Sequence, residues 1–146
     1  MVKSSHIMLV EDNPMDVELL LEAFRETRPG NKVHVVHSGE EALDYLFGRD
    51  AYTDRAAHPL PDLVLLDLKL PGVDGHEVLR QIKDAPNLKR LPIIILSSSQ
   101  ENGDRARCYG YGANGYLVKP ASFSGFLNMV RQVTDYWLTL NVHHPE

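Results

Sequence analysis

The sequence predicts an α/β fold in which helices cover both faces of a parallel sheet. Two four-residue apolar runs, residues 63–66 and 93–96, lack the polar alternation of a half-exposed strand and are typical of strands buried on both faces. Amphipathic helical patterns separate these runs from each other and from three weaker ones. Strand and helix therefore alternate five times, which predicts a doubly wound parallel sheet with right-handed crossovers.

The three weaker strands are expected at residues 7–10, 33–36 and 116–118. Residues 33–36 are the more polar of these, which suits a strand at the edge of the sheet. A polar stretch, residues 48–61, is expected to form an irregular loop before the third strand.

The helices are predicted from apolar spacing and from signals at their ends. The first helix is expected to begin near Pro14, because proline suits the first turn. Ser38 with Glu41 forms a capping-box pattern ahead of the second helix, and Asp74 with Glu77 does so ahead of the third. The last helix is the clearest, since one apolar face continues for about four turns, through Phe123, Phe126, Leu127, Val130, Val133 and Trp137.

The fourth helix is the weakest of the five. It contains Gly103 and Gly110, each of which costs about 1 kcal/mol relative to alanine inside a helix. It also offers few apolar anchors beyond Ala106 and Tyr109. We expect this helix to shift readily.

Length and composition predict a single cytoplasmic domain. The 146 residues suit one domain, residues 1–146, with a core at about residues 5–138, a short C-terminal tail and no effector domain. A lone cysteine, Cys108, fits a reducing compartment, and no segment reads as a signal peptide or membrane span. The formal net charge of −5 leaves no basic stripe for nucleic acid. We therefore expect neither nucleic-acid nor membrane binding.

Polar side chains follow four of the five predicted strands. Glu11 and Asp12 follow the first strand, Asp67 the third, Ser97 the fourth and Lys119 the fifth. The carboxyl ends of parallel strands meet at one edge of the sheet, where ligands bind in doubly wound folds. We therefore expect these side chains to form one site.

The residue types at this edge are those of a phosphoryl-transfer site. Three clustered carboxylates repel one another unless a cation or a raised pKa relieves the repulsion, and oxygen ligands favour Mg²⁺. A lysine can neutralise charge from the other side, and a serine hydroxyl can donate a hydrogen bond to an incoming oxyanion. Together they can support phosphoryl transfer to or from a carboxylate.

At these residues the sequence resembles the response-regulator receiver family of two-component signalling. The resemblance covers roughly residues 5–138 and lies in the acidic pair Glu11-Asp12, in Asp67 within the segment LLDLKLPGVDG, in Ser97, and in Lys119 within the segment GYLVKP. Each motif alone is common, but all of them in order at successive strand ends are specific. The resemblance implies a flavodoxin-like (βα)5 fold with strand order 2-1-3-4-5.

The resemblance also implies roles for the site residues. Mg²⁺ would be bound directly by Asp12 and Asp67, by Glu11 largely through water, and by the main-chain carbonyl of Lys69. A histidine kinase would phosphorylate Asp67, while Lys119 and Ser97 stabilise the charge on the phosphoryl oxygens.

Further implications concern the switch and the class of activity. Ser97 would turn toward the phosphoryl group and Tyr116 would move inward behind it, which would change the surface near the fourth helix, fifth strand and fifth helix. A cis peptide bond before Pro120 would aim Lys119 inward. The protein would then not be an enzyme beyond its own phosphotransfer and dephosphorylation, and it would signal through a partner or phosphorelay.

Two other classes of protein fit the sequence less well than a receiver domain does. A haloacid-dehalogenase-type phosphatase would place a second aspartate two residues after the nucleophile, where this chain has Lys69. A pseudo-receiver that only binds partners would be expected to lose Asp67, Lys119 or an acidic ligand, and all are present.

The expected partners are a histidine kinase and a second copy of the chain. The loop at residues 48–61 and the segment FSGF at 123–126 resemble the single-domain regulators that partner bacterial and cyanobacterial phytochromes. Tyr136, Leu138 and Leu140 cannot all lie on the sheet-facing side of the last helix. The surplus apolar surface, and pairing of family members through this region, predict a homodimer through the last strand and last helix.

Overall fold

The computed structural model describes residues 5–98 and 102–140 and confirms the predicted α/β fold. Its five parallel strands lie in the order β2-β1-β3-β4-β5. The strands are β1 (His6–Val10), β2 (Lys32–Val36), β3 (Leu63–Leu66), β4 (Ile93–Ser97) and β5 (Gly115–Val118). Each predicted strand is present, and β3 and β4 are buried along their whole length.

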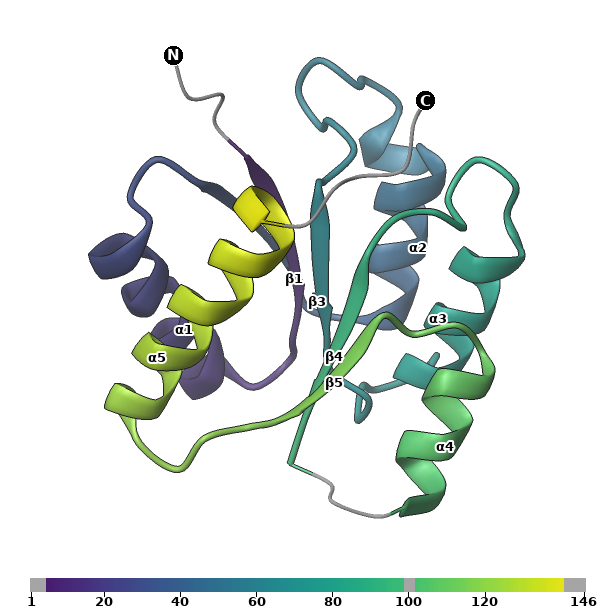
Figure 1. The fold of residues 1–146 in the computed structure, drawn as a ribbon. Coiled ribbons are helices and arrows are strands. Elements are labelled where there is room, and N and C mark those ends of the chain that lie inside the picture. The colour runs from purple at the N-terminus through teal and green to yellow at the C-terminus, as the bar shows by residue number, and fades with distance from the viewer. Residues whose placement is uncertain (1–4, 99–101, 141–146) are drawn as a thin grey trace.

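The helices form two layers, one on each face of the sheet. They are α1 (Pro14–Thr27), α2 (Gly39–Phe47), α3 (Gly75–Asp84), α4 (Asn102–Gly110) and α5 (Phe123–Thr134). Helices α1 and α5 pack together on one face, while α2, α3 and α4 cover the other (Figure 1). Separate apolar clusters fill the two interfaces, so each face of the central strands is covered by helices.

The residues predicted to cap the helix N-termini form capping hydrogen bonds. The Glu41 N–H donates to Ser38 Oγ at 3.1 Å, and the Glu77 N–H donates to Asp74 Oδ1 at 3.0 Å. Helix α1 begins at Pro14 with Asn13 as its N-cap. These caps satisfy orphan amide donors at the helix N-termini, so the starts of the helices are determined locally.

The loop at residues 48–61 is held to α2 by specific contacts. The Arg55 guanidinium donates at 2.7 Å to the carbonyl oxygens of Tyr45 and Leu46, and the Tyr45 hydroxyl donates to the Pro59 carbonyl at 2.9 Å. A short 3-10 helix, η1 (Asp50–Tyr52), lies within the loop. The segment therefore contains more order than the sequence predicted.

Helix α5 is shorter than expected. It ends at Thr134 and continues as a π-helical segment, η2 (Asp135–Leu140), so about three α-helical turns replace the predicted four. The Thr134 hydroxyl donates to the Val130 carbonyl at 2.7 Å. This back-bond offers the carbonyl an alternative partner to the regular helix ladder, and such bonds bend helices.

The apolar residues at this end differ in exposure, as expected of residues that cannot all lie on the sheet-facing side. Tyr136 is about half exposed, whereas Leu138 packs partly buried against the cluster between the sheet and the helices α1 and α5. The side chain of Leu140 lies outside the described part of the structure.

Helix α4 is indeed weakly packed, but the named anchors are wrong. Ala106 and Tyr109 face solvent, and the buried residue of this helix is Cys108. One turn of helix separates the i and i+4 positions, so a face that carries Cys108 and Asp104 cannot also carry Ala106.

A pair of histidines, His6 on β1 and His34 on the edge strand β2, makes the stability of the fold depend on pH. His6 Nδ1 and His34 Nε2 lie 2.9 Å apart, so one nitrogen must be an unprotonated acceptor. Burial lowers the pKa of His34, and the positive charges of His6, His58 and Lys32 lower it further. The unfolded chain therefore binds more protons at this residue than the folded chain does.

We expect thermal stability to fall as the pH drops below about 6.5, the ordinary pKa of histidine, toward the lower pKa of folded His34. A His34→Gln variant should lose less of its melting temperature than wild type between neutral pH and pH 5. Its matched control is His37→Gln, which changes an exposed histidine of the next segment. Parallel pH dependence in wild type and His34→Gln would show that another group controls acid stability.

Candidate metal and phosphorylation site

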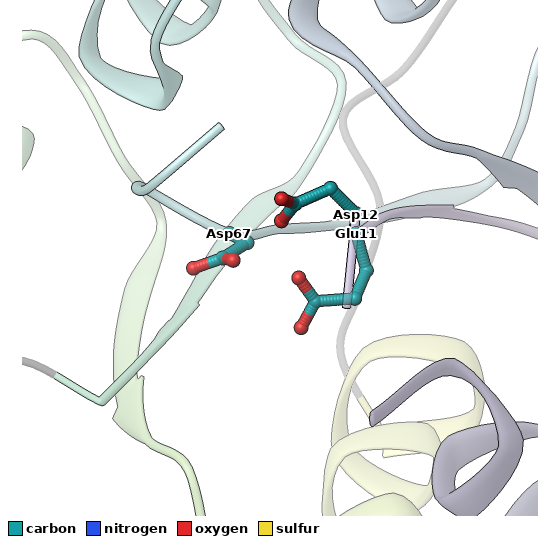
Figure 2. A group of neighbouring side chains, drawn as sticks. All are labelled: Glu11, Asp12 and Asp67. Atoms are coloured by element: carbon teal, nitrogen blue, oxygen red, sulfur yellow. The ribbon is translucent and has the colours of Figure 1, made fainter. Parts of the chain in front are cut away.

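Three carboxylates converge where β1 and β3 end. Val10 pairs with Leu66 in the parallel register, so Glu11 and Asp67 leave the sheet side by side. The Asp67 N–H donates to the Val10 carbonyl at 3.0 Å, which extends the pairing to the acidic residues. Ligand oxygens of Glu11, Asp12 and Asp67 lie within 4.8 Å of one another, and Figure 2 shows their side chains turned toward a common space.

The three carboxylates differ in exposure. Glu11 is 1% and Asp67 6% exposed, whereas Asp12 faces solvent. Burial raises the pKa of Glu11 to about 8, and the neighbouring Asp67 carboxylate adds to the increase. Two carboxylates with little access to water repel each other unless a positive charge lies between them.

Lys119 supplies a positive charge on the other side of the cluster. Val118 pairs with Ser97 at the end of β5, and the Lys119 N–H donates to the Ser97 carbonyl at 2.8 Å. Lys119 Nζ lies 2.5 Å from Glu11 Oε1 and 3.4 Å from Asp67 Oδ2. Burial alone would lower the pKa of Lys119, but its acidic partners outweigh that effect and raise it. The lysine is therefore charged at neutral pH.

Asp16 is a member of this site that sequence reasoning missed. Lys119 Nζ lies 2.8 Å from Asp16 Oδ2, closer than it lies to Asp67. Asn13 caps α1 by accepting from the Met15 and Asp16 N–H groups, which places Asp16 in the first helical turn. An acidic residue there is usually explained by the helix dipole.

The remaining predicted residues belong to β4, β5 and the segment after β3. Ser97 is fully buried at the end of β4, and Tyr116 is partly buried within β5. The Lys69 N–H lies 3.4 Å from Asp67 Oδ1, and its side chain points into solvent. The residues that end β4 and follow β1, β3 and β5 thus lie at the carboxyl edge of the sheet, whereas Tyr116 lies inside its strand.

Backbone packing holds the segment that carries Asp67 against α3. A Cβ atom at Gly75 would lie 2.4 Å from the Asp67 carbonyl oxygen and 2.6 Å from Leu68 Cα. The Gly75 N–H donates to the Leu68 carbonyl at 2.9 Å. Only glycine permits this approach, so the start of α3 packs directly on the backbone of residues 67 and 68.

The cis peptide bond before Pro120 is not found. No peptide bond is cis in the described ranges, and the Lys119–Pro120 bond is trans. The trans form is the favoured one even before proline. Lys119 reaches the carboxylates in this conformation.

The donor set fits a divalent cation. Within the described residues, neither oxygen of buried Glu11 accepts a well-directed hydrogen bond, although Lys119 Nζ lies close to one of them. Buried carboxylate oxygens without such partners have unused capacity for a metal, and carboxylates are hard ligands.

No helix within residues 5–98 and 102–140 combines the length and hydrophobicity needed to span a bilayer.

Comparisons with known proteins agree with this geometry. Residues 7–131 match the model of the response regulator receiver domain. The chain is 39% identical over 135 residues to the probable methanogenesis regulatory protein FilR2 of Methanothrix harundinacea, a match that covers 92% of this chain and 84% of FilR2.

Two solved structures resemble the whole fold. The phosphorylated cyanobacterial phytochrome response regulator RcpA superposes with a TM-score of 0.90 and 37% identity, covering 98% of this chain and 100% of RcpA. The Mn²⁺-bound response regulator Rcp1, a protein of Synechocystis, superposes with a TM-score of 0.85 and 32% identity, covering 97% of this chain and 99% of that one. From its family model, its relatives and its fold, this chain belongs to the response regulator receiver domain family.

Proposed function

We propose that the chain is a response regulator that accepts a phosphoryl group from a histidine kinase on Asp67, with Mg²⁺ as cofactor. One observation carries the proposal: Asp67 belongs to a cluster of carboxylates that could hold a cation, and the ammonium group of Lys119 lies 3.4 Å from its Oδ2. Phosphoryl transfer depends on cationic groups that neutralise the charge on the phosphoryl oxygens. We further propose that residues 1–146 form one domain and that the protein acts in the cytoplasm.

The proposed reaction joins a carboxylate oxygen of Asp67 to phosphorus. An Asp67 oxygen attacks in line, the new O–P bond forms, and the P–N bond of phosphohistidine breaks. The electron pair stays on the imidazole nitrogen, which can then be protonated. Lys119 and the Ser97 hydroxyl are placed to stabilise charge on the equatorial oxygens. Water later attacks phosphorus and restores Asp67.

Asp12, Asp67, Glu11 and the Lys69 main-chain carbonyl are the proposed magnesium ligands, with Glu11 acting largely through water. Bound Mg²⁺ would neutralise charge on the phosphoryl oxygens. The exposed position of Asp12 leaves it accessible to a hydrated ion, and the buried position of Glu11 suits a role behind the ion.

The basic test is phosphorylation itself. Purified protein should acquire acid-labile phosphate from a phosphorylated histidine kinase when Mg²⁺ is present. Chelation of Mg²⁺ should stop the transfer. Absence of labelled aspartyl phosphate with every kinase tried, and with small-molecule phosphodonors, would contradict the proposed function.

An Asp12→Ala variant should bind Mg²⁺ at least tenfold more weakly, since even second-shell changes weaken metal sites about 10- to 100-fold. Isothermal titration of the metal alone would measure this effect. Asp84→Ala is the matched control, because Asp84 is an exposed carboxylate that pairs with Arg80 on α3. Equal affinities of Asp12→Ala and wild type would remove Asp12 from the proposed ligand set.

We propose that the kinase docks beside the first helix. A surface groove of about 670 Å³ lies along α1 and the start of α5, and its lining includes Met15, Leu19 and Phe123. Met15 is 71% exposed, so the groove offers apolar surface to a partner helix. The likeness to RcpA, a phytochrome response regulator, supports a phytochrome-type kinase as the partner.

We propose that phosphorylation switches the surface formed by α4, β5 and α5, through Ser97 and Tyr116. Ser97 lies at the end of β4, and Tyr116 pairs with Ile95 of the same strand. Helix α4 is the next element after β4 in the chain, and it has little buried surface. A downstream protein or phosphotransfer partner would recognise the altered surface.

We propose a homodimer through β5 and α5, supported by the exposure of Val118 at the end of β5 and of Tyr136 in the segment η2 that continues α5. Sedimentation at micromolar concentration should show a dimer, and Tyr136→Glu should shift it toward monomer. Met15→Glu is the control, since Met15 is an exposed apolar residue at the α1 groove. Monomers alone, with and without a phosphoryl mimic, would contradict the dimer.

A further inference from the structure

Helix α4 is attached to the rest of the domain by few side chains. Among its residues, Cys108 is the one that is fully buried, while Tyr109 is about half exposed. Burial of apolar area is the main force that holds a surface helix in place. The position of α4 must therefore depend strongly on individual contacts.

The buried imidazole of His76 on α3 provides two such contacts. His76 is 7% exposed, and its Nε2 lies 3.2 Å from Asp104 Oδ1. Its Nδ1 lies 3.6 Å from Cys108 Sγ. Asp104 and Cys108 are four residues apart and share one face of α4, so a single ring contacts two successive turns of the helix.

The three groups have complementary hydrogen-bonding capacity. Burial raises the pKa of the Cys108 thiol to about 11, so the sulfur keeps its proton at neutral pH. The thiol can then donate to Nδ1, while Nε2 carries the ring proton and donates to the Asp104 carboxylate. This tautomer satisfies both contacts with a neutral imidazole.

His76 is also linked directly to the segment that carries Asp67. Its chain neighbour Gly75 packs on the backbone of Asp67 and Leu68 so closely that no Cβ atom would fit. The Gly75 N–H donates to the Leu68 carbonyl at 2.9 Å. A shift of this segment would therefore move the first turn of α3 and, with it, the imidazole that contacts α4.

We propose that His76 is a positioning residue. Its contacts with Asp104 and Cys108, which we call the latch, hold α4 in the position that it has in the unphosphorylated protein, and they couple this position to the phosphorylation state of Asp67. The coupling part of this inference rests on the proposed phosphorylation of Asp67. The latch itself does not, because it is a property of the unphosphorylated protein. Release of the latch would favour the switched position of α4.

Amide hydrogen exchange of the unphosphorylated protein tests the latch. His76→Leu removes both contacts, and exchange over residues 102–110 should rise about five- to tenfold, in line with the loss of a buried hydrogen bond. His76→Gln, whose amide can still donate to Asp104, should restore much of the protection. Arg105→Ala is the control on the exposed side of α4. Unchanged exchange in His76→Leu would overturn the latch, provided that β4 and α5 remain protected and so confirm folding.

Affinity for the phosphoryl mimic beryllofluoride tests the coupling. If the latch stabilises the resting state, His76→Leu should bind beryllofluoride about five- to tenfold more tightly than wild type, because less free energy is needed to release α4. A residue with only a structural role would leave the affinity unchanged or weaken it, and either result would overturn the coupling. Failure of wild type to bind the mimic would instead count against the proposed function, and the exchange result would still decide the latch.

Discussion

An Asp67→Asn variant should accept no phosphoryl group, while wild type is labelled under the same conditions. The substitution keeps the size of the side chain but removes the anionic oxygen that would attack phosphorus. Asp67 lies in the acidic cluster and 3.4 Å from Lys119 Nζ, and Glu11, which also lies near Lys119, is 1% exposed and less accessible to a phosphodonor. The measurement is incorporation of acid-labile phosphate from a phosphorylated kinase.

The control for this variant is Asp84→Asn, which removes a charge from the exposed surface of α3. It should be labelled like wild type. Far-ultraviolet circular dichroism would confirm that Asp67→Asn is folded. Labelling of folded Asp67→Asn at the wild-type rate would show that the phosphoryl group goes elsewhere, and the site assignment would be wrong.

The position of Asp67 could be predicted from the sequence because buried parallel strands have a strong pattern. Residues 63–66 and 93–96 are continuous apolar runs, and the polar residue after each run must leave the sheet at the same edge. The strand order places β1 and β3 side by side, so Glu11 and Asp67 become neighbours. These contacts follow from topology and need no knowledge of side-chain packing.

Contacts between helices could not be predicted in the same way. Asp16 approaches Lys119 because α1 packs with α5 on one face of the sheet and its first turn reaches the residue after β5, and the local pattern of Asp16 is equally typical of a helix-dipole partner. Cys108 replaces Ala106 and Tyr109 as the buried side of α4 because the rotation of a short polar helix is set by its neighbours. His76 gave no sequence signal, since a histidine after a glycine has no fixed role.

The π-helical segment η2, which continues α5, is a further feature that the sequence does not predict. Apolar spacing from Phe123 to Trp137 predicts a continuous helix, because Trp137 remains in the same apolar cluster in either geometry. The change of geometry at Thr134 accompanies its hydroxyl bond to the Val130 carbonyl. Threonine is common enough inside helices that its presence alone does not predict such a bond.

The second large effect is expected for Lys119→Met, which should change phosphotransfer and metal binding in opposite directions. The ammonium group is the positive partner of Glu11 and Asp16 and lies 3.4 Å from Asp67. Without it, the equatorial oxygens of the transferring group lose a charged donor. Removal of one such donor typically slows a reaction about 10²- to 10³-fold. Rapid-quench measurement of transfer from a phosphorylated kinase would show this loss.

Mg²⁺ should bind Lys119→Met more tightly than wild type, by roughly tenfold, because a cation that repels the ion is gone from the far side of the carboxylates. Titration with the metal alone measures the change, and Lys32→Met, an exposed lysine on β2, is the control. A general loss of structure would weaken metal binding and transfer together. Slower transfer with tighter metal binding would therefore identify Lys119 as a charge that acts on the phosphoryl group, whereas weaker binding of Mg²⁺ would mean that the lysine organises the acidic cluster for the metal.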